Sequence, residues 1–70
     1  MNVLTKEQLE SIGGIFDVGK VYNLNYYKVI LFDDGFVFLK GPSMLSETEK
    51  GKTLEDLENI LKELEINSVN

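Results

Sequence analysis

The apolar runs VILF at residues 29–32 and FVFL at residues 36–39 flank Asp33-Asp34-Gly35. An Asp-Gly pair between two β-forming runs is a strong hairpin signal, because both central residues of a type I′ turn need a positive φ. Neither run alternates apolar with polar residues, so both faces of the hairpin must be covered. A chain of 70 residues therefore needs two covers for one small sheet, and a binding partner is a candidate for the second.

The residue types that are absent from the chain exclude several kinds of catalytic and binding site. The chain has no Cys and no His, and its seven cations are all Lys. It therefore has no disulfide, no thiolate metal site and no imidazole for acid–base work. A net charge of −5 without Arg argues against nucleic-acid and anionic membrane surfaces. We expect a protein that is not an enzyme, with no catalytic residue, no cofactor and no metal.

The lengths of the apolar runs also indicate whether the chain could cross a membrane. The longest wholly apolar runs are four residues, far short of the ~20 residues that span a bilayer. The N-terminus has no charged region followed by an apolar stretch, so no signal peptide is expected. We expect a cytoplasmic protein with no membrane contact.

Two segments carry helix signals. Thr5 and Gln8 have capping-box spacing, which predicts a helix from about Lys6 to Ile12, ended by Gly13-Gly14. Leu4 and Leu9 have the spacing of a hydrophobic staple. The second helix begins with the pair Thr53 and Asp56, ends near Glu65 and leaves residues 66–70 as a frayed tail. Its apolar stripe contains Leu54, Leu57, Ile60, Leu61 and Leu64.

Between the helices the sequence predicts a three-stranded antiparallel meander. Its strands are residues 15–22, 26–32 and 36–40, with Gly19 marking a bulge or a tight bend and residues 23–25 a turn. Residues 44–52 read as irregular, with Ser46 and Glu49 suited to cap a single helical turn. The expected fold is one small α+β domain over residues 1–70, with the order α-β-β-β-α.

An Asp34-Gly35 loop pairs Phe32 with Val37 and sorts the side chains into two faces. We expect the second helix to cover the face formed by Tyr26, Ile30, Phe32, Val37 and Leu39. The other face then has only the short first helix, a second copy of the chain or another partner as its cover. That face contains Tyr27, Val29, Leu31, Phe36 and Phe38.

Two short motifs have simpler explanations than a binding site. The residues Lys50-Gly51-Lys52-Thr53 resemble the end of a phosphate-binding P-loop, but Ser46 stands where that motif requires Gly. Asp33-Asp34-Gly35 is followed by residues 36–39, which supply none of the oxygen ligands of a calcium loop. A polar loop before a capped helix and a tight turn account for both.

The sequence thus favours a small acidic protein-interaction module, such as an inhibitor, adaptor or regulatory subunit. The aromatic face supplies apolar anchors and the acidic second helix steers a partner, for which a basic protein is a candidate. The predicted partner-binding residues are Tyr27, Phe36, Phe38, Glu55 and Glu58. One alternative is a structural homodimer with no foreign partner. Another is a nucleic-acid mimic that blocks a basic groove.

Overall fold

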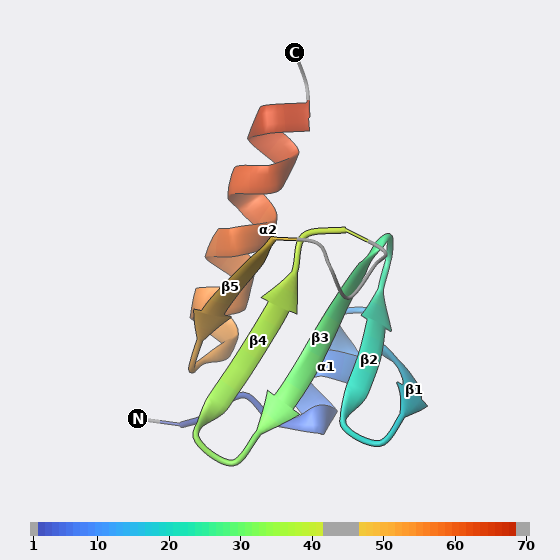
Figure 1. Ribbon diagram of the computed structural model, residues 1–70. Coiled ribbons are helices and arrows are strands. Elements are labelled where there is room, and N and C mark those ends of the chain that lie inside the picture. The colour runs from blue at the N-terminus through green and yellow to red at the C-terminus, as the bar shows by residue number, and fades with distance from the viewer. Residues whose placement is uncertain (1, 42–46, 69–70) are drawn as a thin grey trace.

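An antiparallel sheet of five strands lies against two helices in the computed structural model, which describes residues 2–41 and 47–68 (Figure 1). The strands are neighbours in the order in which they occur in the chain. This arrangement confirms the α+β class, the antiparallel meander and the two helices, but it adds two strands. The elements are α1 (Lys6–Ser11), β1 (Ile15–Val18), β2 (Val21–Leu24), β3 (Tyr27–Phe32), β4 (Gly35–Leu39), β5 (Thr48–Gly51) and α2 (Leu54–Ser68).

The first added strand comes from residues 15–22, which form two strands instead of one. Gly19 has a φ of +60°, a conformation that Gly adopts without a Cβ penalty. The chain therefore reverses completely at Gly19 and Lys20, and β1 pairs back onto β2. The next turn contains Asn25 and Tyr26, with Asn25 at a φ of +58°.

The second added strand is β5, in a segment predicted to be irregular. Its residues pair with β4 from Phe36↔Gly51 to Leu39↔Thr48. The helical turn predicted over Ser46 and Glu49 is wrong at Glu49, which is in β5, while Ser46 lies outside the described residues.

The β3–β4 hairpin turns one residue earlier than predicted, and this moves the pairing of the two strands by two residues. Phe32 pairs with Gly35, not with Val37, and the turn residues are Asp33 and Asp34. Neither aspartate has a positive φ, so the turn is not type I′. Gly35 is needed instead because the backbones of β4 and β5 approach each other closely at this point. A Cβ at Gly35 would collide with the Gly51 carbonyl oxygen of β5. A shift of two residues keeps every side chain on the same face.

Helix α1 begins as predicted. Thr5 Oγ1 accepts a hydrogen bond from the Gln8 backbone N–H at 3.2 Å, and Gln8 Oε1 accepts one from the Thr5 N–H at 3.2 Å. Helix α2 extends to Ser68, so the tail predicted from residue 66 is wrong for residues 66–68.

The core lies between the helices and one face of the sheet. Leu9 of α1 and Leu57 of α2 are completely buried there, together with Phe38 and Val29. In Figure 1 both helices lie behind the sheet, and its opposite face is turned toward the viewer. The predicted assignment of faces is therefore reversed, since the helices cover the face of Val29 and Phe38.

The added strands explain the reversal. They contribute Tyr22 and Leu24, both buried, to the face of Val29 and Phe38. On the opposite face Asn23 lies beside Lys28, and Lys50 lies beside Val37. Burying that second face would remove these polar groups from water at a cost.

Candidate functional site

Three of the predicted partner-binding residues belong to the intramolecular core. Phe36 and Phe38 are 2% and 0% exposed. Tyr27 is partly buried, and its ring centroid lies 5.2 Å from that of Phe38. Phe36 and Phe38 are inaccessible to a partner while the domain is folded, so their prediction as surface anchors is corrected, whereas Tyr27 stays partly exposed.

Glu55 and Glu58 have a different position. Both are exposed on α2, which lies on the helix side of the sheet (Figure 1). The acidic residues and the uncovered sheet face therefore belong to opposite layers of the molecule. The structure does not bring the predicted aromatic and acidic residues together into one surface.

The uncovered face of the sheet carries a continuous apolar row that crosses four strands. Val18 pairs with Val21, Val21 with Ile30, and Ile30 with Val37. We call Val18, Val21, Ile30 and Val37 the open-face stripe. Val18 is 64% exposed and the other three are partly exposed. On β5 the row ends at Lys50, which pairs with Val37.

A polar group borders the stripe on one side. The Lys28 Nζ donates to Asn23 Oδ1 at 2.8 Å and lies 3.4 Å from Asp17 Oδ2. Asp17 is placed for this ion pair by the irregular pairing between Phe16 and Val18, where an extra residue enters β1. The positive charge of Lys28 is thus balanced within the sheet itself.

A hollow of about 450 Å³ adjoins the stripe at the β3–β4 turn. Phe32, which is 41% exposed, and Val37 supply its apolar walls. Lys50 and Lys52 line it from the side of β5. Lys20 Nζ lies 5.9 Å from the centroid of the Phe32 ring, a cation–π arrangement that holds the ring at the surface.

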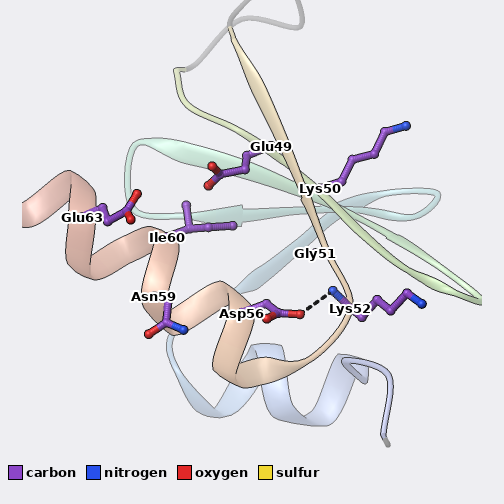
Figure 2. Close-up of a pocket in the computed structure, with 8 residues that line it drawn as sticks. All are labelled: Glu49, Lys50, Gly51, Lys52, Asp56, Asn59, Ile60 and Glu63. Atoms are coloured by element: carbon purple, nitrogen blue, oxygen red, sulfur yellow. Dashed lines mark hydrogen bonds between the residues drawn. The ribbon is translucent and has the colours of Figure 1, made fainter.

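A second depression lies between β5 and α2 and is lined by three acidic side chains together with Lys50 and Lys52. Its volume is about 330 Å³, and Figure 2 shows Ile60 between the carboxylates of Glu49 and Glu63. Asp56 is engaged with the backbone, because its Oδ2 accepts hydrogen bonds from the N–H groups of Lys52 at 2.9 Å and Thr53 at 3.1 Å. These bonds hold the pKa of Asp56 below its ordinary value of 3.8.

The two hollows differ in what they offer a ligand. Lys50 and Lys52 line both of them. The first adds mainly apolar walls, whereas the second adds carboxylates around one isoleucine. Within residues 2–41 and 47–68 no group of three or more carboxylates is arranged to hold a metal ion. Neither helix that the structure describes combines the length and apolar character needed to cross a membrane.

Sequence reasoning missed Val18 and Val21 as surface residues because it placed them within one strand. The signal that could have separated them is Gly19-Lys20 between two valines, since a Gly-X pair between β-branched residues is typical of a two-residue hairpin turn. Comparisons of the chain with protein-family models, curated proteins and solved structures found no match.

Proposed function

We propose that this protein is a non-enzymatic interaction module that binds a protein partner through the open-face stripe and the adjoining Phe32. The observation that supports this proposal is the apolar row on a sheet face that neither helix covers. Apolar residues gathered on an uncovered face are typical of protein–protein contacts. Phe32 lies at a hollow next to this row, where one aromatic side chain contributes much contact area.

The polar surroundings support a protein partner as the ligand. The stripe itself contains no charged residue, and Lys28 at its border is already paired with Asp17 and Asn23. Cores of protein interfaces are depleted in charged residues, and their rims are polar. The chain has no His, Cys or Arg, and this absence argues against catalysis and against phosphate recognition.

The acidic helix acts at longer range in this proposal. Most of the net charge of −5 lies on α2, where Lys62 is the only cation. The acids of α2 are Glu55, Asp56, Glu58, Glu63 and Glu65. Such a field attracts a basic partner and speeds its encounter. The expected partner is therefore a protein of net positive charge with an apolar contact patch.

The test is capture of a partner with charge variants of the open face. Val37→Lys places a charge in the stripe, and its long stem reaches water without unfolding the sheet. Tyr26→Lys is the matched control, because Tyr26 is 85% exposed in the β2–β3 turn. We expect a partner captured from the native extract by the wild type and by Tyr26→Lys, but not by Val37→Lys.

The captured protein is then purified and its Kd is measured by titration calorimetry. A loss of at least about tenfold in affinity for Val37→Lys supports the proposal, as expected for a charge placed against an apolar contact. Equal affinity for wild type and Val37→Lys, or capture of nothing except the chain itself, contradicts it.

A further inference from the structure

The outer strand β1 is an unpaired edge with apolar side chains. Ile15, Phe16 and Val18 are 69%, 54% and 64% exposed, and Asp17 between them is exposed as well. In the part of the chain that the structure describes, β1 pairs with β2 alone. An edge strand offers a row of free N–H and C=O groups to another strand, and apolar residues there increase this tendency.

The charges of the molecule lie so that two copies can approach each other at this edge. The acidic helix α2 begins beside β5, at the opposite edge of the sheet from β1, and its later turns reach the β2–β3 turn but not β1 (Figure 1). Near β1 the carboxylate of Asp17 is balanced by Lys28. Two chains that meet at β1 therefore keep their acidic helices apart in spite of the net charge of −5.

We propose that two copies of this chain pair through their β1 strands, antiparallel and around a two-fold axis, to form one continuous ten-stranded sheet. An edge strand is complementary to itself in this arrangement, as an isologous interface requires. The contact uses the backbone edge of β1, whereas the partner in the proposed function binds side chains of the open face. Val18 belongs to both surfaces, but Phe16 belongs only to the first and Val37 only to the second, so either proposal can fail without the other.

Side-chain chemistry favours a register with the two-fold axis beside Phe16. In this register the Phe16 rings of the two copies face each other on the helix side of the sheet. Each ring already lies edge-on to Tyr22, with centroids 5.6 Å apart, so the pairing creates a row of four aromatic rings. A register centred on Asp17 instead would place two carboxylates opposite each other, which is destabilising.

Light scattering after gel filtration tests the dimer. The contact is small, so we expect dissociation on dilution and measure mass from about 1 μM to about 1 mM. The wild type should approach twice the chain mass of 7.9 kDa at high concentration, and Phe16→Glu should stay at the mass of one chain. Tyr26→Glu and Val37→Glu are controls with the same charge change, and both should retain the dimer.

Cross-linking gives a second readout that does not depend on the stability of Phe16→Glu. The natural chain has no Cys, so Phe16→Cys has a single thiol. Mild oxidation should link two Phe16→Cys chains in high yield and leave Val37→Cys chains unlinked. A wild type that remains monomeric up to about 1 mM overturns the proposal. A dimer lost with Val37→Glu but kept with Phe16→Glu also overturns it.

Discussion

Phe38 on β4 and Ile30 on β3 are both large apolar residues, yet their side chains point to opposite faces of the sheet. Phe38 is completely buried under the helices, whereas Ile30 is partly exposed. A lysine at Phe38 would bury a charge, which costs several kcal/mol. A domain of this size has a free energy of unfolding of only about 4–10 kcal/mol.

We therefore expect Phe38→Lys to unfold the protein and Ile30→Lys to leave it folded. Far-UV circular dichroism and urea denaturation of the two variants measure this difference. Phe38→Ala is an intermediate control and should lose about 3–5 kcal/mol of stability. A folded Phe38→Lys together with an unfolded Ile30→Lys would show that the helices cover the other face.

The sequence predicts which residues share a face but not which face is buried. Val29 and Phe38 belong together in any register that differs by two residues, because side chains alternate along a strand. Choosing the buried face requires knowledge of the neighbouring strands. Tyr22 and Leu24 decide it, because both are buried on the face of Val29 and Phe38 once β2 forms a separate strand.

At the scale of elements, the start of α2 depends on a reciprocal pair of hydrogen bonds. The backbone N–H of Asp56 donates to Thr53 Oγ1 at 3.2 Å, and the Asp56 carboxylate accepts from the Thr53 N–H. Because the ionised carboxylate is the better acceptor, the bonds that it accepts from the N–H groups of Lys52 and Thr53 lower the pKa of Asp56 in the folded state. The unfolded chain then binds a proton more readily than the folded one.

This difference gives a pH dependence with a definite sign. The stabilising contribution of Asp56 is fully present above about pH 4, the unfolded pKa. It is lost as the pH falls through the lower folded pKa. Thermal melts between about pH 2 and about pH 6 should show this loss in the wild type and a smaller slope in Asp56→Asn.

The matched control for this measurement is Glu55→Gln, which removes a neighbouring exposed carboxylate. Its slope should remain close to that of the wild type. An unchanged slope in Asp56→Asn would mean that other carboxylates account for the acid sensitivity.

The helices were predictable as elements because their ends have local signals. Thr5 with Gln8 and Thr53 with Asp56 form the expected caps. Strand β5 has no such signal, since its sequence TEKG is polar. It is a strand because the edge of β4 offers hydrogen-bonding partners, and a non-local cause of this kind is invisible in a short window of sequence.

At the scale of the whole molecule, charge and apolar contact occupy different layers. If the proposed partner is basic, the acidic helix should govern how fast it arrives and the stripe how long it stays. The double variant Glu55→Gln with Glu58→Gln should slow association by about two- to tenfold at low salt. Its dissociation rate should change little.

Surface plasmon resonance at two ionic strengths separates the two effects. Added salt should slow association of the wild type and have a weaker effect on the double variant. Val37→Lys provides the comparison, because its main effect should be faster dissociation. A double variant that loses affinity only through faster dissociation would place Glu55 and Glu58 in the contact itself.

The one-sided covering of the sheet also has a consequence for how this protein can diversify. Because the helices pack only on the face of Val29 and Phe38, residues of the open-face stripe contribute little to the buried core. A library randomised at Val21, Ile30, Phe32 and Val37 should therefore contain many folded members with new binding specificities. The same architecture that leaves this stripe uncovered by the helices makes the chain a scaffold whose recognition can evolve at small cost in stability.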